Sequence, residues 1–431
     1  MNKLRIGPLA PVGTLLSWFT LATATAQPTA LRPHDVQAPT VTTSTTAKAA
    51  PAAAAKATPK LLTSDEIIGL QGAVGVYRQS QAEILGDLIA QTPRDSPDLP
   101  DLWFRLAELH AQAHRFHRLA RIQADIAKAP PTKLAALRAD EKREMVATIK
   151  AYRELTSNPA FTNYPKMDQA LFYYGFTLQT GNYSTDAQKQ FATLLKNYPT
   201  SKFVPDALLA VADAHFEANR LSDAAPMYRQ LLKFPQARVY PYAMYKLAWV
   251  LLNQHDAAGA LDLFEKVVQA TTATDQAVLH RTAQQDYVRA YAAVGKVTLA
   301  QAAFNRLTPG KGFGMLVQLA DIYMGQGQFD KAIYAYRELI AGVAAQPNSK
   351  SPYNACEWQA NIVQATAASG NVDNKVAELT TLVQLSQALQ KAHRLPAAML
   401  TECTETASAL TNEAARQLHA EWAKTKAPRL R

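Results

Sequence analysis

The feature that most constrains this chain is a pattern of small and aromatic residues that recurs five times. In each occurrence a small or aliphatic residue is followed twelve positions later by alanine, and four positions after that by an aromatic ring. The five sets are Gly175–Ala187–Phe191, Ala212–Ala224–Tyr228, Ala248–Ala260–Phe264, Val288–Ala300–Phe304 and Ala320–Ala332–Tyr336. The alanines, from 187 to 224, 260, 300 and 332, are 37, 36, 40 and 32 residues apart. A period of this length predicts units that bury their apolar faces by stacking on one another.

Each unit is expected to be a pair of antiparallel helices. Small residues let two helices approach closely, and a ring four residues after the alanine lies on the same helix face. Turn-forming residues separate the two helices of each unit, at Gly181-Asn182, Asn219, His255-Asp256, Gly295 and Gly327. Proline lies between units, since Tyr198-Pro199 recurs 36 residues later as Phe234-Pro235. The pattern predicts an all-α fold.

These residues resemble the tetratricopeptide repeat (TPR) family, whose unit is about 34 residues long. The resemblance covers about residues 168 to 340 and departs from the family in two respects. Most spacings exceed 34 residues, and Val288 is bulkier than the family prefers at that position. The resemblance implies a right-handed superhelical solenoid of antiparallel helix pairs. It also implies a concave groove, formed by the first helix of each pair, in which peptides bind.

The rest of the chain divides by composition and helix signals. Helices are expected from about 65 to 91, 98 to 128 and 131 to 157, and Leu102–Lys128 resembles a degenerate first repeat. The predicted regions are a signal peptide over 1–26, a disordered Ala/Pro/Thr/Lys-rich linker over 27–62, an N-terminal helical region with a degenerate repeat over 63–160, a core TPR array over 161–345, and a degenerate last repeat with C-terminal capping helices over 346–431.

The first residues are typical of an export signal. Lys3 and Arg5 precede the apolar stretch from Leu15 to Ala22, and Ala24-Thr25-Ala26 suits cleavage before Gln27. The alternative is a short membrane anchor, but the apolar stretch is shorter than the roughly 20 residues that a span needs. We therefore expect a periplasmic or extracellular protein without a transmembrane span in the mature chain. With this signal, the chain resembles periplasmic repeat proteins of bacterial envelopes.

The two cysteines and the net charge leave several partners open. Cys356 and Cys403 either pair in an oxidising compartment or remain buried thiols. The net charge of +10 suits an anionic surface or peptidoglycan. No basic stripe interleaved with aromatic residues is found, so no nucleic-acid partner is expected.

The sequence favours a protein that is not an enzyme and binds no cofactor. HExxH, GxSxG and Walker-type phosphate motifs are all missing from it. His110, His114 and His117 share one helical face and would suit a metal ion. Apart from Glu108 and Asp125, no nearby cysteine or carboxylate completes such a site. We therefore interpret this face, which also carries Arg118 and Arg121, as solvated.

Mapping the family's groove onto this sequence yields candidate partner-binding residues, with the alternative that several of the rings are ordinary core. They are Phe172, Phe176, Asp213, Tyr242, Tyr245, Trp249 and Arg289. An aromatic groove with a few charges suits an extended or helical peptide.

Three hypotheses of function remain open. The first is a periplasmic TPR scaffold or adaptor that binds protein or peptide partners in a cell-envelope complex. The second is a peptidoglycan-binding protein or an accessory of a wall-remodelling enzyme. The third is a structural oligomerisation module that associates through C-terminal helices at about 386 to 424.

Overall fold

The fold is known from a computed structural model that describes residues 64–344, 355–368, 372–392 and 395–425, with side chains from residue 78 onward. The predicted signal peptide and linker lie outside these residues. Within them the chain forms sixteen α-helices, two short 3-10 helices and no β-strand. The helices are α1 Ser64–Gln91, α2 Leu99–Ile126, α3 Pro131–Ser157, α4 Met167–Thr180, α5 Ser184–Asn197, α6 Val204–Glu217, α7 Leu221–Leu231, α8 Tyr240–Asn253, α9 Ala257–Thr271, α10 Ala277–Val294, α11 Ala300–Leu307, α12 Gly312–Gly325, α13 Phe329–Ala344, α14 Ala355–Ala368, α15 Val372–Ala392 and α16 Ala397–Thr425, with 3-10 turns at Pro159–Phe161 and Val297–Leu299.

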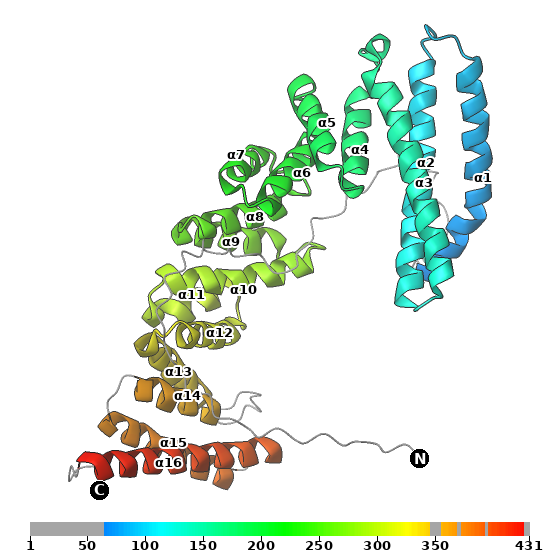
Figure 1. The fold of residues 1–431 in the computed structure, drawn as a ribbon. Coiled ribbons are helices and arrows are strands. Elements are labelled where there is room, and N and C mark those ends of the chain that lie inside the picture. The colour runs from blue at the N-terminus through cyan, green and yellow to red at the C-terminus, as the bar shows by residue number, and fades with distance from the viewer. Residues whose placement is uncertain (1–63, 345–354, 369–371, 393–394, 426–431) are drawn as a thin grey trace, which may run out of the picture.

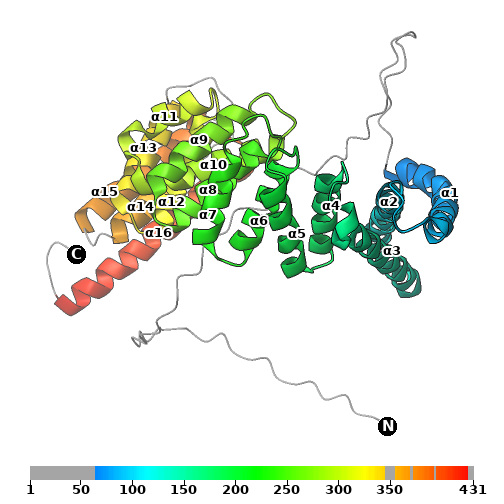
Figure 2. The same cartoon turned by 90° about the horizontal axis from the view of Figure 1, so that it is seen from above.

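Successive helices pack side by side into a curved array, which confirms the predicted all-α solenoid (Figure 1). The long helices α1 to α3 form one end of the array, and α14 to α16 form the other (Figure 2). One hydrophobic core continues from Leu99 in α2 to Ile362 in α14. The predicted division at residues 160 and 345 remains a prediction.

The recurrent small and aromatic residues form the centre of this core. The five rings are at most 1% exposed, and the alanines that precede them by four positions are at most 2% exposed. At Gly175 an added Cβ would lie only 2.7 Å from Cε1 of Phe191, so the ring occupies the space that the missing side chain leaves. Val288 is also fully buried, so the fourth unit accommodates the bulkier residue.

The predicted turns between the helices of a unit depend on left-handed backbone. Asn182, Asn219, His255 and Gly327 have φ values of 64°, 57°, 65° and 71°. Asparagine and glycine tolerate this conformation best, which explains their place at these turns. The turn at Gly295 differs, because its φ is −79° and a 3-10 turn follows. The 40-residue spacing arises before this turn, since Ala260 and Val288 are 28 residues apart and α10 has 18 residues.

One expectation for the ends of the array needs correction. Leu102–Lys128 is not a repeat, because residues 99–126 form the single helix α2, which packs on α3. No glycine, proline or asparagine interrupts α2 after its first turn, so nothing bends the chain into a pair. At the other end, the predicted C-terminal helices at about 386 to 424 correspond to the end of α15 and to α16.

The structure resolves the alternatives for the cysteines. Cys356 in α14 and Cys403 in α16 form a disulfide, with their Cα atoms 5.7 Å apart and a sequence separation of 47 residues. Around it, a second small core contains Ala360, Val363 and Leu382. The disulfide therefore connects α14 to the predicted C-terminal cap.

Replacing both cysteines with alanine should destabilise this end of the molecule. A cross-link that closes a loop of this length restricts the unfolded chain, which corresponds to about 4 kcal/mol. We expect α14 to α16 to unfold at a lower denaturant concentration than α4 to α12, as measured by amide hydrogen exchange along the chain. Unchanged exchange in α16 would contradict a stabilising role for the disulfide.

Candidate partner-binding surface

The inner face of the array is defined as the solvent-facing side of the first helices of the five units. These helices are α4, α6, α8, α10 and α12. In Figure 1, α6 and α10 lie on the hollow side of the curved array, whereas α7 and α11 lie on its outer side. Partners that enter the curve therefore meet the first helices.

With the small residue of each unit counted as position eight, two junctions between neighbouring first helices follow the same rule. The ninth residue of one helix contacts the sixth residue of the next, as Asp213 contacts Lys246 and Trp249 contacts Asp286. The ninth residues are Phe176, Asp213, Trp249, Arg289 and Asp321, and the sixth residues that follow them are Ala210, Lys246, Asp286, Gln318 and Asn361.

Between α6 and α8 this rule produces a buried polar cluster. The hydroxyl of Tyr228 donates to Oδ1 of Asp213 at 2.5 Å, and Nζ of Lys246 lies 3.5 Å from the same oxygen. The Lys246 ammonium also lies 3.9 Å from the centre of the Phe216 ring. Burial raises the pKa of the Asp213 carboxyl, and the charge of Lys246 counteracts this shift.

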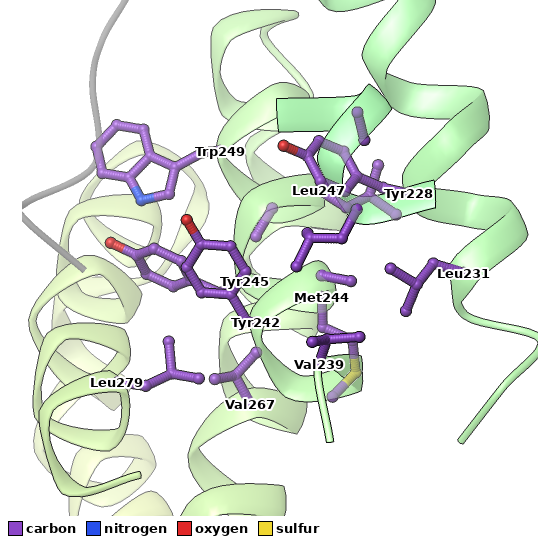
Figure 3. Packing of buried hydrophobic residues seen from close by; sticks show 14 of the residues in the cluster. Tyr228, Leu231, Val239, Tyr242, Met244, Tyr245, Leu247, Trp249, Val267 and Leu279 are labelled. Carbon is purple, nitrogen blue, oxygen red and sulfur yellow. The ribbon is translucent and has the colours of Figure 1, made fainter. Parts of the chain in front are cut away.

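Between α8 and α10 the acceptor is Asp286. Its Oδ2 accepts hydrogen bonds from the Tyr245 hydroxyl at 2.8 Å and from Nε1 of Trp249 at 3.1 Å. The Arg289 guanidinium lies over the Trp249 ring, 5.5 Å from its centre. Figure 3 shows Tyr242, Tyr245 and Trp249 projecting from the same side of α8. The pKa of Tyr245 is raised, first by burial and then by the charge of Asp286.

The type of residue at the ninth position also correlates with the buried ring of its own unit. The Tyr336 hydroxyl donates to Oδ1 of Asp321 at 2.9 Å, which repeats the Tyr228–Asp213 contact. In the other three units the buried ring is phenylalanine, and the ninth residue is not acidic. A buried hydroxyl requires an acceptor, whereas a phenyl ring does not. Asp213 and Asp321 therefore have a structural role.

The structure separates the seven candidate residues by burial. Phe172 and Tyr242 are 1% and 4% exposed, and Tyr245 and Trp249 are fully buried. Their side chains pack within and between units, so in this structure they are closed to a partner. The prediction that these four rings contact a partner is corrected in that sense, because side chains of their own and of neighbouring units surround them.

The remaining three candidates are more accessible. Phe176 is 41% exposed, and Arg289 is half-buried over Trp249. The Asp213 side chain is 16% exposed and belongs to the polar cluster with Lys246. Partner contact through these residues stays a prediction. The sequence did not point to Tyr173, Glu108 and Asp206, which are half-buried on α4, α2 and α6. Their exposure depends on tertiary packing, for which the sequence carries no evident signal.

The histidine face of α2 is not solvated as predicted, because it packs against α3. Nδ1 of His110 lies 2.8 Å from Oε2 of Glu144, and Nε of Arg121 donates to Glu141 at 2.5 Å. His114 is buried, and burial lowers the pKa of its imidazole. In the described part of the chain, no group of three or more His, Cys, Asp or Glu side chains is arranged to bind a metal ion.

Comparison with known proteins identifies the repeats. Models of the tetratricopeptide repeat match residues 178–238, 212–277 and 315–341. These segments of the chain are tetratricopeptide repeats. The repeats of this family act as scaffolds for protein–protein interaction, and their fold is generally a non-catalytic module. None of the curated proteins compared with the chain matches it.

Similar solved structures share little sequence with this TPR protein. One is a tetratricopeptide repeat protein from Parabacteroides merdae, at 12% identity over 69% of this chain and 99% of that chain, with a TM-score of 0.33. Another is the C-terminal part of a TPR repeat-containing protein from Cytophaga hutchinsonii, at 15% identity over 69% and 95% of the two chains, with a TM-score of 0.37. None of the helices described for this chain is long and apolar enough to cross a membrane.

Replacing Asp286 with alanine should destabilise the array strongly. The hydroxyl of Tyr245 and Nε1 of Trp249 would then lose their acceptor inside the protein, at a cost of about 2–4 kcal/mol for the two groups. As a control, Asp275→Ala removes a carboxylate from an exposed ion pair with Arg238, which contributes about 0–1 kcal/mol. Urea unfolding monitored by circular dichroism would measure the free energy of unfolding of each variant. Equal effects of the two substitutions would contradict the role given to Asp286.

Proposed function

We propose that this TPR protein is an exported scaffold that binds protein partners of the cell envelope on its inner face. The observation that carries the proposal is the array of family repeats whose first helices expose side chains along one continuous face. Gln285 and Asp321 are exposed there, and Met324 is half-buried. Arginine, methionine and aromatic residues are the types enriched at protein interfaces, and Arg289 and Phe176 add two of them.

Two features support export. Residues 1–26 have the basic, apolar and small-residue order of a signal peptide. The Cys356–Cys403 disulfide is the kind of bond that persists in the periplasm or outside the cell and is rare in the cytosol. Both features favour a protein that acts in an oxidising compartment.

A second candidate function, binding to an anionic cell-wall polymer such as peptidoglycan, is favoured by a basic hollow. Its volume is about 520 Å³, and it lies between the loops that precede α6 and α8. Lys202, Lys233 and Arg238 line it together with Asp206, Pro205 and Phe234. This hollow is formed by the inter-unit loops, so a polymer there would use different side chains from a protein on the inner face.

Export predicts a processed and oxidised protein in cells. The mature chain should begin at Gln27, and its cysteines should resist alkylation unless a reductant is added first. Mass spectrometry of the protein from fractionated cells measures both properties. An intact N-terminus together with free thiols in the cytoplasmic fraction would contradict export.

Partner binding on the inner face predicts where cross-links form. A photo-reactive residue in place of Gln285 should capture envelope proteins, because this side chain is exposed on that face. The matched control is Asp262, which is exposed on α9, a second helix. Mass spectrometry identifies the captured molecules. Equal capture from Asp262, or recovery of wall fragments alone, would contradict the scaffold and favour the second candidate.

A further inference from the structure

The hairpin of α2 and α3 projects beyond the helix that follows it. These two helices have 28 and 27 residues, whereas α4 has 14. Gly181, directly after α4, lies against the middle of α3, since an added Cβ there would be 2.9 Å from Sδ of Met145. The contact between His110 and Glu144 places the middle of α2 at the same level. Residues 115–143, here called the hairpin tip, therefore extend past the end of α4, as the lower end of the hairpin in Figure 1 shows.

The hairpin tip carries half of the net charge of the whole chain. Its 29 residues include eight Lys and Arg and three Asp and Glu, a net charge of +5 out of the total of +10. Two of the acids are already paired. Nε of Arg121 lies 2.5 Å from Oε2 of Glu141. Nη1 of Arg143 lies 2.6 Å from Oδ1 of Asp140. Three exposed cations of the tip take part in no ion pair with the described residues: Arg118, Lys128 and Lys133.

Three aliphatic side chains of the same tip are also exposed. Leu119, Ile122 and Ile126 are 47%, 40% and 79% exposed. Their spacing of three and four residues places them in one stripe along α2. Phe104 lies on the same stripe nearer the start of α2, and it is 3% exposed and packs on the ring of Tyr152. The stripe is therefore part of the core near the start of α2 and open where the hairpin projects.

Exposed aliphatic side chains among lysines and arginines suit the boundary of an anionic bilayer. Basic side chains are attracted to the lipid phosphates, and hydrophobic side chains gain free energy when they enter the acyl region. A polar wall polymer would leave the three aliphatic side chains without an apolar environment. Interfaces with proteins are enriched in aromatic residues, whereas all three of these side chains are aliphatic. The combination of charge and exposure therefore favours a lipid surface.

We propose that the hairpin tip binds the surface of an anionic lipid bilayer, with Ile122 and Ile126 in the outer acyl region and Lys128 and Lys133 at the phosphates. Ile126 is the last residue of α2, and Lys128 lies in the turn that follows it, so both are at the end of the projection. Such a contact lies on the bilayer and does not span it. The inference goes beyond the proposed function, because it concerns helices outside the five units and another class of partner.

The binding test uses the chain from Gln27 onward, with its disulfide intact, and two kinds of lipid vesicle. One kind is phosphatidylcholine alone, and the other is an equal mixture of phosphatidylcholine and phosphatidylglycerol. Co-sedimentation at increasing lipid concentration measures the affinity. We expect binding to the anionic vesicles that weakens as salt is added, and little binding to phosphatidylcholine alone.

Two sets of substitutions in the tip should weaken this binding for separate reasons. The triple variant Arg118→Gln, Lys128→Gln, Lys133→Gln should lower the vesicle affinity roughly a hundredfold, as expected for three basic residues near an anionic surface. The double variant Ile122→Ser, Ile126→Ser should lower it roughly tenfold, because two side chains no longer enter the acyl region. All five side chains are exposed, so both variants should keep the circular dichroism spectrum and the unfolding temperature of the parent.

Matched controls make the same changes elsewhere. Lys196→Gln, Arg229→Gln, Lys296→Gln removes three exposed cations from α5, from α7 and from the turn after α10. Val278→Ser, Leu299→Ser replaces two aliphatic side chains that are 58% and 57% exposed. Both control variants should bind anionic vesicles nearly as well as the parent. Equal losses from the tip variants and the controls would overturn the proposal, and so would equal binding to the two kinds of vesicle.

Other occupants of the tip give different results. If no vesicles are bound and the tip variants instead reduce sedimentation with purified peptidoglycan, the tip binds a wall polymer and the lipid surface is overturned. If the tip variants instead convert a dimer into a monomer in ultracentrifugation, the tip binds a second copy and the proposal is equally overturned. The proposed function is tested separately, because cross-linking at Gln285 uses no residue of the tip and has the same expected outcome whether or not vesicles bind.

Discussion

The structure depends on the close approach of two helices at a residue with little or no side chain. At Gly175 the ring of Phe191 occupies the space of a Cβ, and the same geometry recurs with alanine in three of the four following units. Because the ring must fill the gap between helices, its own chemistry determines what surrounds it. A buried tyrosine requires an acceptor on the first helix, and a buried phenylalanine leaves that position free for other uses.

The ninth position therefore carries different residue types in different units. Asp213 has a structural role where Tyr228 is buried, whereas Phe176 and Arg289 occupy the same position above phenylalanine rings. The neighbour on the next helix then determines exposure. Asp286 and Arg289 cover Trp249, but Ala210 leaves Phe176 open. Contacts between the ninth and sixth positions thus join neighbouring units at two junctions, between α6 and α8 and between α8 and α10.

Much of the fold could be predicted because local signals agree with global packing. The helix over 131–157 was predicted with the bounds that the structure has, and the left-handed turns lie at predicted residues such as Asn219. The candidate site was harder to predict. Phe176 and Trp249 occupy the same position of their units, yet Phe176 is 41% exposed and Trp249 is fully buried, and only the tertiary packing shows this difference. The disulfide likewise required the tertiary approach of α14 and α16.

The central claim is that partners bind the inner face of the repeat array. Hydroxyl-radical footprinting of the mature protein with a captured partner tests it most directly, because it reports the solvent access of individual side chains. The account predicts that the partner reduces oxidation of Phe176 and Met324 and leaves Tyr183 and Tyr334, which are exposed outside that face, unchanged. Protection of Tyr183 and Tyr334 without protection of Phe176 and Met324 would contradict it.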